Sequence, residues 1–339
     1  GSVIAFSQTA DVSLKIVVSQ GMSTITGKGG IRVESTTGNA SLSIKGSGSL
    51  DVEPKGSNSG ITLCSSKNTN LDIDGADVTA SSPAQYGVYL ISSTDATSTS
   101  TITVNNGSLT TGGNGNVGIY YYWSGTSNAG TSSLTVSGNA VVDTRNSQIM
   151  AQNKETVVQV GAGSDGNGGI VFDGKSGTVY GDVTLQENLT IGEGETLTVP
   201  EGSSLNCNEK LTNNGTILAS GGTVSGQLKN GTTVTTPSIT GQPQNKKVTA
   251  GETAEFSVTA TAGSETPTYQ WQQSTDSGSN WTDISGATSA SYTINSTTIS
   301  MSGYQYRCVV KSASGVSVIS SAATLTVTAL PEPEPEPEP

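Results

Sequence analysis

The chain has 339 residues and a formal net charge of −12, with 15 lysines and arginines against 27 aspartates and glutamates. Because nucleic-acid binding needs a basic surface, this charge excludes that class of partner. The sequence contains no histidine, which removes the commonest general base and the commonest zinc ligand. We therefore expect a protein that is not an enzyme and has no resident cofactor, with calcium left open.

The composition favours β-structure throughout. Only 32% of the residues are apolar and glycine contributes 43 residues, so few side chains are available to form the core. Apolar and polar residues alternate along most of the chain, which is typical of half-buried strands and not of disorder. We therefore predict an all-β fold. Cys64, Cys207 and Cys308 are far apart and odd in number, so we expect each to be a small buried residue and not part of a disulfide framework.

Residues 1–234 are predicted to form a parallel β-helix, or β-solenoid, with coils of about 29–32 residues up to residue 150. Four copies of one strand pattern begin at anchors 29, 31 and 32 residues apart: Leu42, Leu71, Ile102 and Leu134. An earlier, weaker copy begins near Leu14. A glycine or asparagine recurs at one place in each copy and predicts a corner with positive φ: Gly46, Gly75, Asn106 and Gly138. The alternative is a stack of small β-sandwich modules, for which each copy is too short.

Two carboxylates in the second copy form a candidate metal site. Asp72 and Asp74 alternate with apolar residues, so both should point outward from one strand. Coil stacking places Lys45 one coil below Asp74 and Asn105 one coil above it. Three interpretations stay open: surface charge matching, a calcium site, and a catalytic pair of the kind found in β-helix polysaccharide lyases and hydrolases.

An aromatic cluster in the next two coils is the strongest candidate for a ligand site. Alternation turns Tyr89 outward in one coil and Tyr120 and Tyr122 outward in the following coil, with Tyr86 and Trp123 nearby. Outward tyrosines on a regular sheet predict a platform for sugar rings, because each offers rigid apolar area and a hydroxyl group. Alternatively, the loop after Trp123 covers these rings and makes them a local satellite core.

The repeat shortens after Asp182, and apolar residues then recur every six to eight positions as far as Leu228. This pattern predicts a narrower continuation of the solenoid over residues 182–228. The segment VTLQENLTIGEGETLTVPEGSSL and the following LTNNGTI resemble β-helical regions of Firmicutes surface proteins over roughly residues 183–226. The resemblance implies a β-helical surface protein.

Residues 237–329 contain more aromatic residues, and turn signals recur about every 8–12 positions. Trp271, followed by Tyr306 two residues before Cys308, resembles the core of bacterial immunoglobulin-like modules. The position of the partner cysteine is Phe256 in this chain. The resemblance therefore implies an immunoglobulin-like module whose core is closed by aromatic packing without an intersheet disulfide.

Residues 330–339 end in alternating proline and glutamate, which prevents helix and ladder pairing and predicts an extended spacer. This segment resembles the wall-spanning stalks of Gram-positive surface proteins. The start at Gly1-Ser2 suggests a mature or trimmed chain. We therefore expect an extracellular protein attached to a cell surface or cell wall. No apolar run reaches about 18 residues, so we expect no membrane insertion within this segment.

Three functions are compatible with these observations. The first is an adhesin-like protein that binds an extracellular glycan, or a component of a host or cell-wall surface, through the aromatic face. The second is a purely structural spacer. The third is a polysaccharide lyase or hydrolase, which would need basic partners for its carboxylates, whereas Arg32 and Arg145 are the only arginines of the solenoid.

Overall fold

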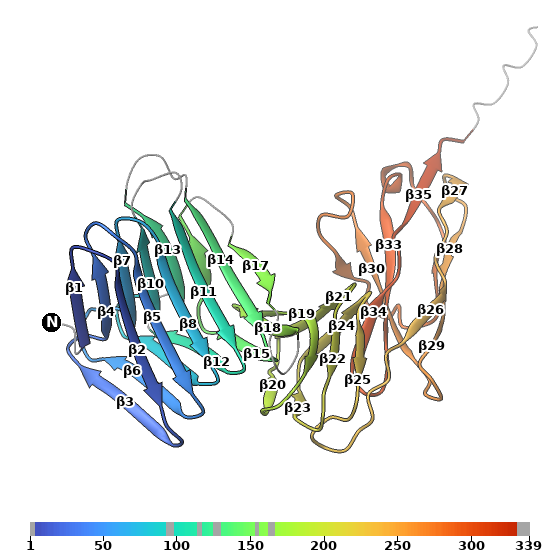
Figure 1. The fold of residues 1–339 in the computed structure, drawn as a ribbon. Helices are drawn as coiled ribbons and strands as arrows, with labels where there is room; N and C mark the ends of the chain where they lie inside the picture. The colour runs from blue at the N-terminus through green and yellow to red at the C-terminus, as the bar shows by residue number, and fades with distance from the viewer. Residues whose placement is uncertain are drawn as a thin grey trace, which may run out of the picture.

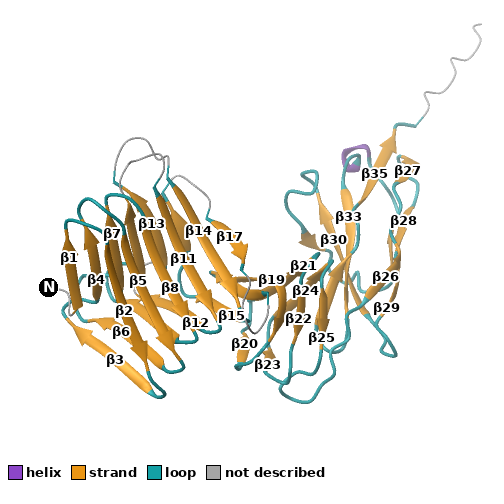
Figure 2. Cartoon of the chain, in the orientation of Figure 1, coloured by secondary structure: helices purple, strands orange, loops and turns teal. Residues whose placement is uncertain are grey.

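The computed structural model describes residues 4–92, 98–113, 117–124, 130–152, 156–161 and 167–330. Within these ranges nearly every element is a β-strand, and the helical content is the single 3-10 turn Ile299–Met301. Figures 1 and 2 show a large solenoid, a small solenoid and a C-terminal sandwich following one another along the chain. The predicted all-β fold is confirmed.

The large solenoid consists of three parallel sheets, each receiving one strand from every coil. Sheet 1 contains β1 (Ile4–Gln8), β4 (Ile31–Ser35), β7 (Ile61–Ser65), β10 (Val88–Ser92), β13 (Ile119–Trp123) and β16 (Ile149–Ala151). Sheet 2 contains β2 (Val12–Val18), β5 (Ala40–Gly46), β8 (Thr69–Asp74), β11 (Thr99–Asn105), β14 (Thr131–Ser137) and β17 (Val157–Val160). Sheet 3 contains β3 (Met22–Gly27), β6 (Ser49–Pro54), β9 (Asp77–Ser82), β12 (Ser108–Gly113), β15 (Ala140–Thr144) and β18 (Gly168–Asp173).

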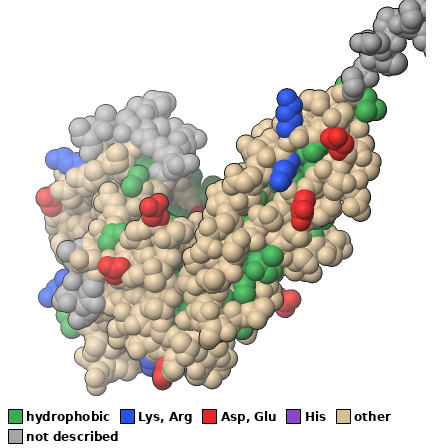
Figure 3. Space-filling view, turned by 90° about the vertical axis from the view of Figure 1, so that its right-hand side faces the viewer, with side chains coloured by type: hydrophobic (Ala, Val, Ile, Leu, Met, Phe, Trp, Pro, Cys, Tyr) green, Lys and Arg blue, Asp and Glu red, His purple; other side chains and the backbone are tan. Residues whose placement is uncertain are grey.

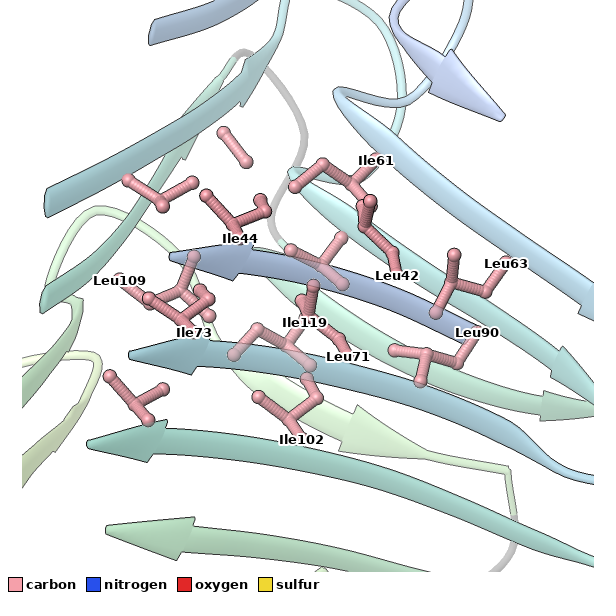
Figure 4. Packing of buried hydrophobic residues seen from close by; sticks show 14 of the residues in the cluster. Leu42, Ile44, Ile61, Leu63, Leu71, Ile73, Leu90, Ile102, Leu109 and Ile119 are labelled. Carbon is pink, nitrogen blue, oxygen red and sulfur yellow. The ribbon is translucent and has the colours of Figure 1, made fainter. Parts of the chain in front are cut away.

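The core of the large solenoid is a set of aliphatic ladders. Residues at equivalent places in successive coils pair directly, and one such run is Leu14, Leu42, Leu71, Ile102, Leu134 and Val158. The four middle members of this run are fully buried. Figure 4 shows the side chains of Leu42, Leu71 and Ile102 in the space between the sheets. Because these are the anchors of the sequence repeat, the predicted coil register is confirmed.

The corners follow the prediction as well. Gly46, Gly75, Asn106 and Gly138 all adopt positive φ, at 132°, 76°, 51° and 62°. A Cβ atom on Gly46 would lie 1.9 Å from the carbonyl oxygen of Val18. Glycine is therefore required at that corner both for its backbone conformation and for the close approach of the preceding coil.

The small solenoid begins where the chain reverses direction. β18 pairs antiparallel with β19 (Ser176–Thr184), and the strands after it pair in parallel: β20 (Leu189–Ile191), β21 (Thr196–Pro200), β22 (Ser204–Asn206), β23 (Leu211–Asn213), β24 (Thr216–Ser220) and β25 (Thr223–Ser225). Paired residues in successive coils, such as Leu197 and Ile217, are about 20 positions apart. The small solenoid has its own apolar core.

Arg145 of the large solenoid binds residues of the small solenoid. Its guanidinium donates to the carboxylate of Asp143 at 2.5 Å, to the carbonyl oxygen of Thr190 at 2.5 Å and to the carboxylate of Glu195 at 3.3 Å. It also lies over the ring of Phe172, 4.8 Å from the centroid. The hydrogen bond to Asp143 is the main reason that the pKa of Arg145 is raised. A charged side chain with this many partners fixes the position of the turn after β20.

The C-terminal sandwich is the predicted immunoglobulin-like module. Its strands are β26 (Ser238–Gly241), β27 (Lys246–Thr249), β28 (Ala254–Ser257), β29 (Thr259–Thr261), β30 (Thr268–Ser274), β31 (Thr282–Asp283), β32 (Ser291–Ile294), β33 (Gln305–Lys311), β34 (Val316–Ile319) and β35 (Ala323–Thr328). One sheet holds β28 and β32, and the facing sheet joins β27, β35, β33, β30 and β31. This pairing pattern is that of an immunoglobulin-like sandwich.

Aromatic packing closes the core of this module, as expected. The ring of Phe256 lies 4.7 Å from that of Tyr306 and 6.5 Å from that of Trp271. Cys308 is buried beside them as a free thiol. The predicted absence of a partner cysteine is thus compensated by ring contacts across the two sheets.

The sandwich is joined to the small solenoid by a shared sheet. β24 pairs in parallel with β34 through Ile217–Val316 and Leu218–Ser317, and Val316 belongs to the core of the small solenoid. In addition, the backbone N–H of Thr235 donates a hydrogen bond to the hydroxyl of Ser314 at 3.0 Å. The module therefore covers the last coil of the small solenoid with one of its own strands.

The Pro–Glu segment at residues 331–339 lies outside the described residues. Among the elements that are described, no helix has the length and apolarity that a bilayer span would require. On the face shown in Figure 3, charged side chains are scattered over an otherwise uncharged surface.

Candidate ligand-binding faces of the solenoid

The outer face of sheet 1 carries the predicted tyrosines. Tyr89 on β10 pairs directly with Tyr120 on β13, and both side chains are half-buried. Their rings are nearly parallel, with an angle of 8° between planes and 5.7 Å between centroids. The alternation that turns these two residues outward was predicted from the sequence and is confirmed.

Tyr86 and Tyr122 complete a cluster that we call the tyrosine face, defined as Tyr86, Tyr89, Tyr120 and Tyr122. Tyr86, from the turn before β10, tilts against both Tyr89 and Tyr120 at 4.8 Å. Tyr122 lies 6.1 Å from each of the same two rings. Because the flat sides of Tyr89 and Tyr120 face each other, the cluster offers ring edges and hydroxyl groups more than open ring faces.

Burial raises the pKa of the two central tyrosines, Tyr89 and Tyr120. The pKa of Tyr89 is raised to about 12, mainly by removal from water and secondly by the neighbouring phenols Tyr86, Tyr122 and Tyr120. The pKa of Tyr120 is raised for the same first reason. Both hydroxyls are therefore neutral hydrogen-bonding groups over the whole physiological pH range.

Trp123 is not part of the tyrosine face, which corrects the prediction. Its side chain is fully buried because alternation along β13 sends Ile119, Tyr121 and Trp123 inward. Trp123 pairs with Ser92 of the preceding coil, and both residues point into the solenoid. Nearness to Tyr122 in sequence suggested a shared face, but neighbouring residues of a strand point to opposite sides.

Cys64 lies on the same outer face, where it pairs with Ile91 of the next coil. Its side chain is half-buried, so the expectation of a buried cysteine is wrong for this residue, whereas Cys207 and Cys308 are buried as expected. Desolvation raises the pKa of the Cys64 thiol. A raised pKa keeps the thiol protonated and makes it a poor nucleophile.

The outer face of sheet 2 carries Asp72 and Asp74 in the predicted register. Lys45 pairs with Asp74 from the coil before, and Asn105 pairs with it from the coil after. The ammonium of Lys45 lies 3.3 Å from Asp72 and 3.4 Å from Asp74. The amide of Asn105 donates to Asp74 at 2.8 Å, and the hydroxyl of Ser43 donates to Asp72 at 3.1 Å.

Lys45 offsets one of the two negative charges of this carboxylate ladder. The two aspartates raise the pKa of Lys45, with the charge of Asp72 as the largest cause. In the described part of the chain, no three Cys, Asp or Glu side chains gather as a metal-holding group. The arrangement therefore matches charges on an exposed sheet and leaves each carboxylate with a donor that a metal ion or a substrate would have to displace.

A groove that the sequence did not indicate lies at the junction of the two solenoids. It has a volume of about 760 Å³ between the outer face of sheet 3 and the connection before β20. Some of its polar side chains already have partners: Asp77 accepts a hydrogen bond from Ser108 at 2.7 Å, and Asn139 accepts one from the backbone of Thr184 at 2.7 Å. The groove could not be found from periodicity, since its two walls come from different repeats.

Comparison with protein families matches the C-terminal part of the chain. The family described as Domain of unknown function (DUF8696) matches residues 229–329. No curated protein matches the chain. Three solved structures illustrate the similarity of the sandwich. The Titin M10–Obscurin like 1 Ig complex is 21% identical, over 29% of this chain and 99% of that chain, with a TM-score of 0.23.

The Ig1-2 module of the Drosophila Receptor Protein Tyrosine Phosphatase DLAR is 25% identical, over 29% of this chain and 51% of that one, with a TM-score of 0.24. Sidekick-1 immunoglobulin domains 1–5 are 22% identical, over 29% of this chain and 22% of that one, with a TM-score of 0.23. Scores of this size carry no argument about function. The immunoglobulin-like assignment rests on the strand pairings and the aromatic core described above.

Proposed function

We propose that this chain is a non-enzymatic, adhesin-like protein that binds saccharides weakly through the tyrosine face of its large solenoid. The observation that carries the proposal is the outward cluster of four half-buried tyrosines on adjacent coils. Among the described residues, none of the four hydroxyls is engaged in a side-chain hydrogen bond. They are thus available to the hydroxyl groups of a sugar.

The geometry favours a shallow contact. The stacked rings of Tyr89 and Tyr120 are already ordered by each other and by Tyr86, so binding costs little additional side-chain entropy. Each ring edge can contact the C–H face of a sugar, and each hydroxyl can donate or accept a hydrogen bond. Affinity for one sugar unit is expected to be low because little ring surface is open, and a polymer would gain by multivalent contact.

We further propose an extracellular location with attachment to a cell surface or cell wall. The support is the combination of two solenoids, an immunoglobulin-like module and a Pro–Glu segment in one chain. The ligand would then be an extracellular glycan or a component of a host or cell-wall surface. In this arrangement the C-terminal module and stalk hold the tyrosine face away from the attachment point.

A structural spacer is the second candidate. Two observations favour it: the sheet shared by β24 and β34 and the fastening of the two solenoids by Arg145. The first joins the sandwich to the small solenoid by backbone pairing, and the second joins the two solenoids by ion pairs, as a spacer would need. We do not propose an enzyme, because Asp72 and Asp74 share the Lys45 ammonium and no second basic group of the described residues forms an ion pair with them.

The test is a titration against a panel of soluble polysaccharides, with and without calcium. We expect wild-type binding without calcium, and at least about tenfold weaker binding, or 1.4 kcal/mol, for Tyr120→Ala. Tyr269→Ala, at a half-buried tyrosine of the immunoglobulin-like module, is the matched control and should bind normally. Equal binding by Tyr120→Ala, or no binding by the wild type, would leave the spacer as the better proposal.

A further inference from the structure

Arg307 in the immunoglobulin-like module differs from the other two arginines of the chain. Arg32 and Arg145 each form ion pairs with neighbouring carboxylates. Arg307 forms no ion pair with a described residue, although its side chain is half-buried. Removal from water lowers the pKa of Arg307, whereas the hydrogen bond to Asp143 is the main cause that raises the pKa of Arg145. An anion beside Arg307 would supply the interaction that this guanidinium lacks.

Arg307 belongs to a row of three polar side chains across the outer face of one sheet. β30 pairs with β31 and with β33, and this register places Asp283, Gln272 and Arg307 side by side. The row points outward because the alternating residues Trp271 and Cys308 are fully buried. Nε of Arg307 donates to Oε1 of Gln272 at 2.7 Å, and Nε2 of Gln272 donates to Oδ1 of Asp283 at 2.8 Å. These bonds hold one edge of the guanidinium in place.

Trp281 holds the flat side of the same guanidinium. Cζ of Arg307 lies 4.1 Å from the centroid of the indole ring. The indole is itself fixed, because its Nε1 donates to the carbonyl oxygen of Gly278 at 3.0 Å. Stacking leaves the donors of a guanidinium available, since they point outward in the plane of the group. Arg307 is therefore in position before a ligand binds, and binding costs little side-chain entropy.

The remaining edge of the guanidinium indicates the class of ligand. Nη1 and Nη2 of Arg307 make no hydrogen bond to the described residues. They offer two parallel donors, which match the two oxygens of a carboxylate. A phosphate dianion is less suitable, because Asp283 lies only one side chain away and repels a second negative charge.

Gln305 makes a sugar the favoured carrier of that carboxylate. It lies on the same face of β33, two residues before Arg307 and roughly 6.7 Å from it along the strand. Its side-chain amide makes no hydrogen bond to the described residues. An amide can both donate to and accept from hydroxyl groups, so it can contact the ring hydroxyls of a sugar whose carboxylate is on Arg307.

This site lies within the module, away from the end of the described chain. Tyr306 pairs with Ala323 at the start of β35, so Arg307 stands beside that start. β35 continues to Thr328, roughly 17 Å further along the strand. All the residues that build the site are described, and they belong to β30, β31, β33 and the turn before β31.

We propose that the immunoglobulin-like module binds the carboxylate of an acidic sugar unit, with Arg307 as the bidentate anchor. Nη1 and Nη2 each donate to one carboxylate oxygen, while Trp281 and Gln272 keep the guanidinium in place. Gln305 contacts the hydroxyl groups of the same unit. One such contact is weak, and a uronic-acid polymer gains affinity by presenting many copies of the unit. The site is separate from the tyrosine face and adds a charged class of saccharide.

The test is a titration of the whole chain with an oligogalacturonate, in about 0.15 M salt to screen the repulsion from the net charge of −12. We expect saturable binding and a shift of the Arg307 Nε–H signal in nuclear magnetic resonance. Arg307→Lys keeps the charge and loses the paired donors, so binding should be at least about tenfold weaker. Lys311→Gln is the matched control, because Lys311 is an exposed cation on the same face of the same strand; it should bind normally.

The absence of a shift of the Arg307 signal would overturn the proposal, and this readout needs no variant. An equal shift with a neutral galactose oligomer, or equal weakening by Arg307→Lys and Lys311→Gln, would do the same. Inorganic phosphate acting at lower concentration than acetate would contradict the assignment to a carboxylate. Tyr120→Ala should leave binding of the acidic oligomer at Arg307 unchanged, so failure of this site and failure of the tyrosine face are distinguishable.

Discussion

The large solenoid and the immunoglobulin-like module solve the problem of a small apolar content in different ways. The solenoid stacks medium-sized aliphatic residues such as Leu42 and Leu71 into ladders, and each coil packs only on its neighbours. The module gathers three large rings, Phe256, Trp271 and Tyr306, in one place. Damage to a ladder should therefore stay within a few coils, whereas damage to the ring cluster should unfold the whole module.

The largest expected effect is that of Trp271→Ala. This substitution removes a fully buried ring and its hydrogen bond to the carbonyl of Ser289, at a cost of about 3–5 kcal/mol. Calorimetry should show early unfolding of the module with the large solenoid transition unchanged. Trp281→Ala, at a partly exposed tryptophan that stacks on Arg307, should change the profile little. A simultaneous shift of both transitions would show that the parts do not unfold independently.

A smaller and more local effect is expected for Ile73→Ala. Ile73 is fully buried in the middle of a ladder, and the loss should be about 2–5 kcal/mol. Hydrogen exchange should increase in β5, β8 and β11 while the module keeps its protection. Ile16→Ala, at the half-buried end of the same ladder, should cost less. Loss of protection throughout the chain would contradict the nearest-neighbour picture.

The sequence was sufficient to predict the ladders and the tyrosines because both depend on short periods. Leu42 and Leu71 recur with the coil length, and Tyr89 and Tyr120 follow from alternation along a strand. The prediction that Trp123 lies with the tyrosines was wrong because it relied on nearness in sequence, whereas alternation along the strand sends Trp123 inward. The prediction that Cys64 is buried was wrong because it relied on the general preference of cysteine for burial, whereas Cys64 occupies an outward position of its strand.

The reversal between β18 and β19 could not be predicted in the same way. An antiparallel hairpin uses the same alternating pattern as a parallel coil, and the turn at Gly174 decides between them. The contacts of Arg145 with Thr190 and of Asn139 with Thr184 join residues that are 45 positions apart. No repeat in the sequence relates those residues, so only the folded chain brings them together.

Alkaline pH should weaken the large solenoid moderately. The pKa of Tyr89 is raised to about 12 from an ordinary value of 10.0, so the folded state holds its proton more tightly than the unfolded state. Its contribution to stability is therefore complete below pH 10 and is lost as the pH rises towards 12. Urea unfolding at pH 9 and pH 11.5, followed with phenolate absorbance, should show this decline, and Tyr89→Phe should reduce it.

The smallest effect is expected from chelators. Because Lys45 and Asn105 already satisfy Asp72 and Asp74, EDTA should leave the melting temperature of both solenoids and of the module unchanged. Added calcium should have no effect either. A clear drop of the solenoid transition with EDTA would mean that the carboxylate ladder holds a metal ion, and Asp72→Asn should then abolish the difference.

The pairing of β24 with β34 also determines how the chain bears tension. A pull applied beyond Thr328 acts along β35, and the hydrogen bonds to β27 and β33 lie across that direction. Such bonds must shear together instead of opening one after another. Because β34 in the same sheet is bonded to β24, part of the force passes into the small solenoid through that pairing, beside the part that β27 passes to the connecting residues 229–237.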